Sequence, residues 1–117
     1  MRESILKNKS YHFAVLIVKT YKIISSEKKE YTLSRQLLKS GTSIGANIRE
    51  AEFAQSNKDF INKMSIALKE ANETEYWLLL LKDTEFIKIE DFNLLINHNK
   101  ELIKMLVSTI NTMKSKI

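Results

Sequence analysis

The sequence contains no proline and no cysteine, and it has only two glycines among its 117 residues. Sheet proteins normally need glycine and proline in their turns, so this composition predicts helix throughout. The lack of cysteine excludes disulfides and thiolate metal sites, and it suits the reducing cytoplasm. The longest apolar runs, 14–18 and 77–81, hold five residues each, whereas a membrane span needs roughly 20. We therefore expect a cytoplasmic all-α protein without a membrane contact.

Apolar residues recur at helical spacing in four segments of the chain. The expected helices cover residues 4–25, 33–54, 58–83 and 91–113 of a single domain spanning residues 1–117. Helices of about 20 residues are each about 30 Å long. Because short connections place consecutive helices antiparallel, these segments predict an up-down-up-down antiparallel four-helix bundle.

Each expected helix has an apolar stripe that should face the core. The stripes are Ile5, Phe13, Leu16, Ile17, Thr20, Ile23 and Ile24; Leu37, Gly41, Ile44, Ile48 and Ala51; Phe60, Met64, Ala67, Leu68, Ala71, Leu78 and Leu81; and Phe92, Leu95, Ile96, Leu102, Ile103, Leu106 and Ile110. For the second helix, Thr32 or Ser34 is available as a cap. For the third, Ser56 or Asn57 can cap, and Asp59 suits the positive end of the helix dipole.

Gly41 and Gly45 lie one turn apart inside the second expected helix. A glycine within a helix costs about 1 kcal/mol relative to alanine, so a close contact should compensate. That contact is with a helix of the same chain or with a second subunit. A phosphate-binding loop would need a preceding strand and a Gly-Lys-Ser/Thr ending, and both are missing.

The apolar run 77–81 extends around the third helix, because Trp77, Leu79 and Leu80 lie off its core stripe. A helix that is apolar on all sides must be covered on all sides. A second subunit is the natural cover, so we expect a homo-oligomer that uses these three residues in packing.

The sequence contains no recognisable catalytic or metal-binding pattern, and we expect no enzyme activity, no cofactor and no metal. The di-iron pattern of helical bundles needs Glu-x-x-His, but Lys9 and Leu95 stand three residues before His12 and His98. Asn47, Glu50 and Glu73 are instead expected to form a polar cluster between the second and third helices, as a buried network or an interface rim.

Charge is distributed unevenly along the chain, which carries a net +5. Residues 1–49 have ten basic and three acidic side chains, residues 50–91 have five and ten, and residues 92–117 have four and one. Clustered cations release counterions from a phosphate backbone on binding. Alternatively, these basic residues are ordinary solvated side chains that keep a helical protein in solution.

Basic residues one turn apart form three short ridges on the expected helices. They are Lys19 and Lys22, Arg35 and Lys39, and Lys100 and Lys104. Repeated by a rotation axis, these ridges could contact the backbone of RNA or DNA with little base specificity.

Residues 34–51, with the sequence SRQLLKSGTSIGANIREA, closely resemble the signature of a bacterial four-helix bundle family also called 23S rRNA intervening sequence proteins. The resemblance continues through SNKDFI (56–61), SIALKEA (65–71) and ETEYWL (73–78). It implies an up-down bundle that assembles into a ring, commonly a pentamer, with a basic surface and no established enzymatic activity.

Together these features predict a non-enzymatic homo-oligomer, favoured as a pentamer, that binds the RNA or DNA backbone through its basic ridges. The alternative is a protein-interaction scaffold with no role in nucleic-acid binding, in which the acidic third helix or the ring surface docks another protein.

Overall fold

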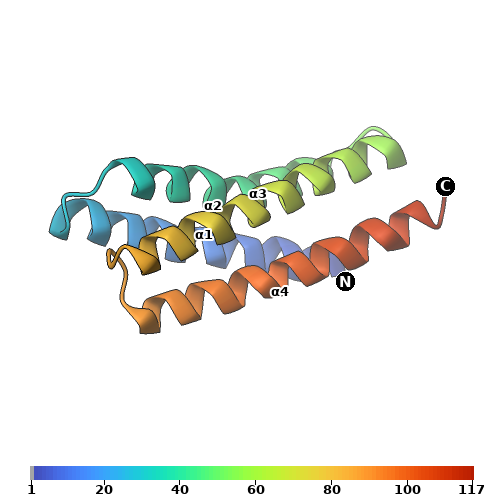
Figure 1. The fold of residues 1–117 in the computed structure, drawn as a ribbon. Helices are drawn as coiled ribbons and strands as arrows, with labels where there is room; N and C mark the ends of the chain where they lie inside the picture. The colour runs from blue at the N-terminus through green and yellow to red at the C-terminus, as the bar shows by residue number, and fades with distance from the viewer. Residues whose placement is uncertain (1) are drawn as a thin grey trace.

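The computed structural model describes residues 2–117, and it describes side chains from residue 5 onward. Four helices follow one another along the chain: α1 (Arg2–Glu27), α2 (Thr32–Ala51), α3 (Asn57–Asp83) and α4 (Ile89–Lys114). The α1–α2 and α3–α4 connections lie at one end of the bundle, and the α2–α3 connection lies at the other (Figure 1). The expected all-α four-helix fold is confirmed.

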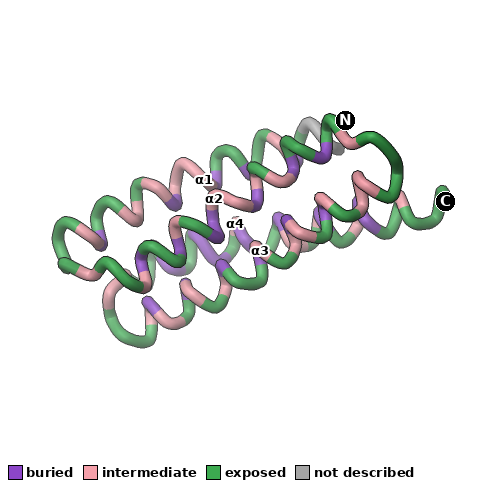
Figure 2. The backbone as a smooth tube through the Cα atoms, turned by 90° about the horizontal axis from the view of Figure 1, so that it is seen from above, coloured by how far each residue is buried: buried purple, intermediate pink, exposed green. Residues whose placement is uncertain are grey.

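Each helix packs against the helices before and after it in the chain, and α4 also packs against α1, which closes the bundle. The bundle measures 48 × 21 × 20 Å. Figure 2 shows buried residues along the inner sides of the helices and exposed residues on their outer sides. Within residues 2–117, no helix is long and apolar enough to cross a membrane.

The apolar stripes expected for α2, α3 and α4 all contribute to the core or pack against it. The stripe expected for α1 was wrong at two positions, because Ile5 and Ile23 are about half exposed. Leu6 and Ser10 are buried instead. Ser10 and Ile17 on the buried side of α1 contact the glycines of α2, whereas Ile23 lines an open groove between α1 and α4 that leaves it accessible.

The N-terminus of α2 is capped differently from the sequence prediction, which named Thr32 or Ser34. Tyr31 occupies the cap position and makes no side-chain cap hydrogen bond. The carboxylate of Glu30 accepts hydrogen bonds from the backbone N–H groups of Leu33 at 2.9 Å and Ser34 at 2.8 Å. A longer acidic side chain therefore satisfies donors that a helix leaves free at its start.

At its other end, α2 stops at Ala51 rather than at the expected residue 54. The backbone N–H groups of residues 52–54 donate to carbonyls three residues earlier, and not four as in an α-helix. The α-helix therefore ends in tighter, 3₁₀-type turns. Ser56 then caps α3 as expected, because its hydroxyl accepts a hydrogen bond from the N–H of Asp59 at 3.0 Å. The connection between α2 and α3 is thus short and locally bonded.

Candidate functional site

Gly41 and Gly45 face α1 of the same chain. A Cβ built at Gly41 would lie 2.8 Å from Cγ1 of Ile17, and one built at Gly45 would lie 3.3 Å from Oγ of Ser10. The two glycines thus permit the close approach of α1 and α2. Of the two partners left open by the sequence, the structure places a helix of the same chain against them.

Buried polar side chains lie at the contact of α2 with α3 and at the contact of α3 with α4. The hydroxyl oxygens of Ser40 and Thr74 are 3.0 Å apart, and Nδ2 of Asn99 donates to the carbonyl of Ala71 at 2.9 Å. Oδ1 of Asn99 is buried without a hydrogen-bond partner among the described residues. Such groups tie neighbouring helices together in one register, and they offer no reactive acid or base.

The structure does not bring the expected polar cluster together. Nδ2 of Asn47 donates to the carbonyl of Ser43 in its own helix at 2.8 Å, and Glu50 forms an ion pair with Lys63 of α3 at 3.0 Å. Glu73 is exposed on the outer side of α3. These three residues therefore have separate partners: Glu50 bridges α2 and α3 at the surface, Asn47 bonds within α2, and Glu73 is exposed.

Glu73 instead affects its neighbour Glu70 on the surface of α3. Burial raises the pKa of the Glu70 carboxyl, and the negative charge of Glu73 adds to this effect, while Lys69 and Lys39 oppose it. Lys39, which we expected to contact a phosphate backbone, therefore lies close enough to α3 to interact with an acidic residue of its own chain.

His12 of α1 and His98 of α4 meet edge to face, with ring centroids 5.6 Å apart. Lys9 and Glu101, one turn away on the same helices, form an ion pair at 2.9 Å. No group of three or more His, Cys, Asp or Glu residues suited to a metal ion occurs in the part of the chain that the structure describes. The two histidines join α1 to α4.

The six basic residues singled out in the sequence are all exposed. None of the six forms an ion pair within the described chain, whereas Lys7, Lys9, Lys63 and Lys82 do. The six do not gather in one patch, because Lys100 and Lys104 lie on α4 and the other four lie on α1 and α2. Lys19 lines a cavity between α1 and α4, and Lys39 lies near Glu70 of α3, so the six cations are spread around the bundle.

Lys22 and Arg35 lie at about the same level of the bundle. The contact between Gly41 and Ile17 fixes the register of these antiparallel helices. Lys22 follows Ile17 by five residues, and Arg35 precedes Gly41 by six. At about 1.5 Å per residue, the two cations are offset by only about 2 Å along the axis.

Residues Tyr76, Leu79 and Leu80 form what we term the α3 outer face. Tyr76 and Leu79 are exposed, Leu80 is half-buried, and the rings of Tyr76 and Trp77 pack edge to face at 4.9 Å. Trp77 is half-buried against the core of its own chain. Of the three apolar residues of α3 expected in packing, Trp77 thus packs partly within its own chain, Leu80 is half-buried and Leu79 is exposed.

A groove of about 730 Å³ lies between the end of α1 and the start of α4, and we term it the α1/α4 groove. Its apolar lining is Leu16, Ile23, Ile24, Phe86, Ile87, Ile89, Leu94 and Leu95. Ile23, Ile89 and Leu94 are each about half exposed. The sequence analysis missed this groove, although Ile89 and Leu94 lie off the core stripe of α4 and could have signalled it.

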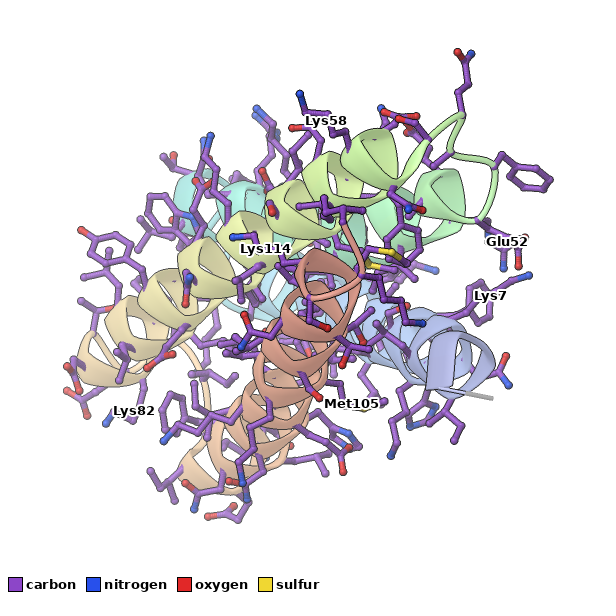
Figure 3. The ribbon with its side chains drawn as sticks, turned by 90° about the vertical axis from the view of Figure 1, so that its right-hand side faces the viewer. Lys7, Glu52, Lys58, Lys82, Met105 and Lys114 are labelled. Atoms are coloured by element: carbon purple, nitrogen blue, oxygen red, sulfur yellow. The ribbon has the colours of Figure 1, made fainter. Side chains whose placement is uncertain are left out.

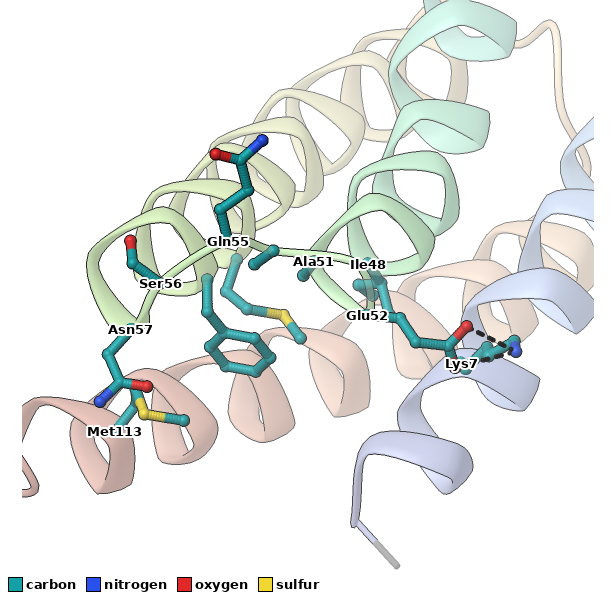
Figure 4. A pocket seen from close by; sticks show the side chains of 11 residues that line it. Lys7, Ile48, Ala51, Glu52, Gln55, Ser56, Asn57 and Met113 are labelled. Atoms are coloured by element: carbon teal, nitrogen blue, oxygen red, sulfur yellow. Dashed lines mark hydrogen bonds and ion pairs between the residues drawn. The ribbon is translucent and has the colours of Figure 1, made fainter.

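A second cavity, of about 450 Å³, lies beneath the α2–α3 connection (Figure 4). Phe60, Met64 and Met113 contribute to its lining, and the ion pair of Lys7 and Glu52 at 3.1 Å stands at one side. Figure 3 views the bundle from this end and shows charged side chains projecting outward around the helices. The cavity contains none of the expected site residues.

Comparison with known proteins gives a consistent result. The model of a family described as 23S rRNA-intervening sequence protein matches residues 2–108. A crystal structure from Bacteroides thetaiotaomicron, of a protein of unknown function from the S23 ribosomal protein family, is 57% identical and superposes with a TM-score of 0.93. The alignment covers 95% of this chain and 99% of that one. No curated protein matches the chain.

Proposed function

Because the chain belongs to the 23S rRNA-intervening sequence protein family, we propose that it is a cytoplasmic ring-forming homo-oligomer, a pentamer, that binds the backbone of RNA or DNA. The protein would act by binding and not by catalysis. The observation that carries the proposal is that the exposed cations Lys22, Arg35, Lys100 and Lys104 form no ion pair in the described chain, whereas Lys7, Lys9 and Lys63 do.

Self-association is supported by the apolar surface that one chain leaves open. Tyr76 and Leu79 on α3, together with Ile23, Ile89 and Leu94 around the α1/α4 groove, are exposed to a third or more of their surface. Large contiguous apolar patches on a soluble protein usually mark an interaction site. A second copy of the chain would cover such patches in every molecule.

Backbone binding is supported by the exposure and spacing of the cations. Lys22 and Arg35 lie at one level of α1 and α2, while Lys100 and Lys104 are one turn apart on α4. Each area is small, and two cations give weak binding at physiological salt. A rotation axis would repeat each area in every subunit and so raise the affinity for a long phosphate backbone.

The proposal is tested by fluorescence anisotropy of labelled RNA and DNA at low salt. Lys22→Gln/Arg35→Gln should lower the affinity about tenfold, because two phosphate contacts are lost. Lys7→Gln/Lys63→Gln removes the same charge from residues already paired with Glu52 and Glu50. Equal effects of the two pairs would contradict a specific role of the free cations.

A protein-interaction scaffold remains the second candidate, and the acidic side of α3 favours it. Glu73 is exposed beside the Tyr76–Trp77 pair, and Glu70 lies close by. This surface would repel a phosphate backbone and attract a basic partner protein. Absence of nucleic-acid binding by an intact oligomer would favour the protein-interaction scaffold.

A further inference from the structure

We propose that the α1/α4 groove is one half of a head-to-tail contact between two copies of this chain, and that the α3 outer face of the next copy enters it. The inference rests on the proposed self-assembly and names the two surfaces that make it. These surfaces belong to different parts of the chain, so the contact joins unlike faces.

The groove has an exposed apolar lining, as expected of a site that another apolar element covers. Leu94 is 49% exposed, and Ile23 and Ile89 are similarly open, although all three stand beside the hydrophobic core. The groove is about 730 Å³ in volume, which is enough to receive several large side chains. Water against this lining carries a free-energy cost that burial would remove.

The α3 outer face has the size and chemistry to fill the groove. Tyr76 is 59% exposed, and Leu79 and Leu80 follow it within one helical turn. Aromatic and aliphatic side chains that project from one helix are the usual anchors of a helix-in-groove contact. Leu79 and Leu80 are also the two residues of the apolar run 77–81 that neither belong to the core of their own bundle nor pack against it.

The two surfaces lie at the same end of the bundle. Residues 76–80 belong to the last turns of α3, and the groove is lined by the last turns of α1 and the first turns of α4, beside the α1–α2 and α3–α4 connections (Figure 1). A rotation about an axis parallel to the bundle therefore brings one surface to the other without a shift along the axis. Repetition of that rotation closes a ring.

Charge also favours pairing of unlike faces. The groove is lined by four lysines and three acids, namely Lys19, Lys28, Lys82, Lys88, Glu27, Glu85 and Asp91. Residues 69–80 of α3 carry one lysine and three glutamates. Lys82 is already paired with Asp83, so the groove has about as many free lysines as acids. Contact between unlike faces places the glutamates of α3 beside Lys19, Lys28 and Lys88, whereas two copies of the α3 outer face would bring glutamate against glutamate.

The contact can be tested by cross-linking, because the wild-type chain has no cysteine. In Leu80→Cys/Leu94→Cys, a short bis-maleimide should link successive copies into a ladder of covalent oligomers. Each single variant should give no such ladder. Dimers formed by Leu94→Cys alone would contradict the proposal, since they would mean that one groove faces another.

Light scattering provides a second test with a matched control. Leu94→Glu should reduce the mass from that of the assembly to the 13.6 kDa of one chain, because a charge would enter the contact. Val107→Glu places the same charge on α4 at a site that is 40% exposed and does not line the groove, and it should leave the assembly intact. Circular dichroism checks that both variants keep their helices.

The outcomes separate this inference from the proposed function. A wild-type protein of 13.6 kDa in solution would contradict self-assembly itself. A wild-type oligomer that keeps its mass in Leu94→Glu, or that gives no ladder in Leu80→Cys/Leu94→Cys, would overturn the assignment of the two surfaces and leave self-assembly standing.

Discussion

Gly41 and Ile17 fit against each other so closely that no side chain fits at position 41. A Cβ there would lie 2.8 Å from Cγ1 and 2.9 Å from Cγ2 of Ile17. Ile17 is completely buried, and its β-branched side chain has little freedom to turn away. The pair sets the spacing and register of α1 and α2.

We expect Gly41→Ala to destabilise the protein by about 1–2 kcal/mol. Alanine gains about 1 kcal/mol of helix propensity over glycine, but overpacking of a filled core costs about 1–3 kcal/mol and a contact below 3 Å places the cost at the upper end. Urea unfolding followed by circular dichroism measures the change. In Ile17→Ala, which removes the clashing atoms, the same Gly41→Ala substitution should become stabilising.

Gly45→Ala is the matched control. A Cβ at Gly45 would lie 3.3 Å from Oγ of Ser10 and 3.4 Å from its carbonyl oxygen, so a shift of a few tenths of an ångström accommodates it. The gain in helix propensity should then make this variant more stable than wild type by about 0.5 kcal/mol. Equal destabilisation by the two alanines would refute the distinction drawn between the sites.

Asn99 is expected to contribute little to net stability. Its Nδ2 bonds to the carbonyl of Ala71, but its Oδ1 is buried without a partner in the described chain. The gain of one hydrogen bond is offset by the cost of the unpaired oxygen. Asn99→Leu, which replaces both groups with apolar atoms of similar branching, should change the free energy of unfolding by less than about 1 kcal/mol.

Asn99→Asp should behave differently, because it places a carboxyl group where the structure offers a carbonyl and no cation. A loss of about 3 kcal/mol or more is expected at pH 7. The loss should shrink in acid, since the neutral form of the carboxyl is easier to bury. Thermal unfolding at pH 7 and pH 4 tests both statements, and a pH-independent loss would argue against the burial of an unpaired charge.

Glu30 should make part of the stability depend on pH. Burial raises the pKa of its carboxyl, but hydrogen bonds from Leu33 and Ser34 together outweigh this effect and lower it below its usual 4.5. A group whose pKa is lower in the folded state stabilises the fold above the unfolded-state pKa, and this contribution is lost as the pH falls through the folded-state value.

Accordingly, Glu30→Ala should cost about 1 kcal/mol at pH 7, as is typical of a lost helix cap. The difference from wild type should disappear as the pH falls below 4.5 and the wild-type carboxyl takes up its proton. Glu27→Ala removes an exposed acid from the end of α1 and serves as the control, with little effect at either pH. A cost of Glu30→Ala that stays constant with pH would contradict the capping role.

The fold could be predicted from the sequence because the helical spacing of apolar residues indicates both the four helices and their inward sides. The inward positions of α2, α3 and α4 follow a regular spacing, and nearly every residue named for them is buried or packed against the core. The error in α1 has a physical cause. Ile5 and Ile23 lie 18 residues apart, which is about five helical turns. They therefore follow a helical period of their own beside the buried residues, and periodicity could not separate the two sets.

The candidate site was less predictable, because it depends on how helices meet. Sequence spacing places Asn47 and Glu50 on one face of α2, but the partner of Glu50 is Lys63 and not Glu73. The level shared by Lys22 and Arg35 depends on the contact between Gly41 and Ile17. Such relationships between helices have no signal within a single helix.

The most direct test of the central claim is the salt dependence of RNA and DNA binding by the wild-type protein, measured by anisotropy from about 50 to 200 mM salt. Counterion release predicts a linear fall of log K with log salt, with a slope of about −0.9 for each phosphate neutralised on a duplex. A steep fall that becomes shallower in Lys100→Gln/Lys104→Gln is the expected result. Absence of binding by an assembled protein at the lowest salt would contradict the account.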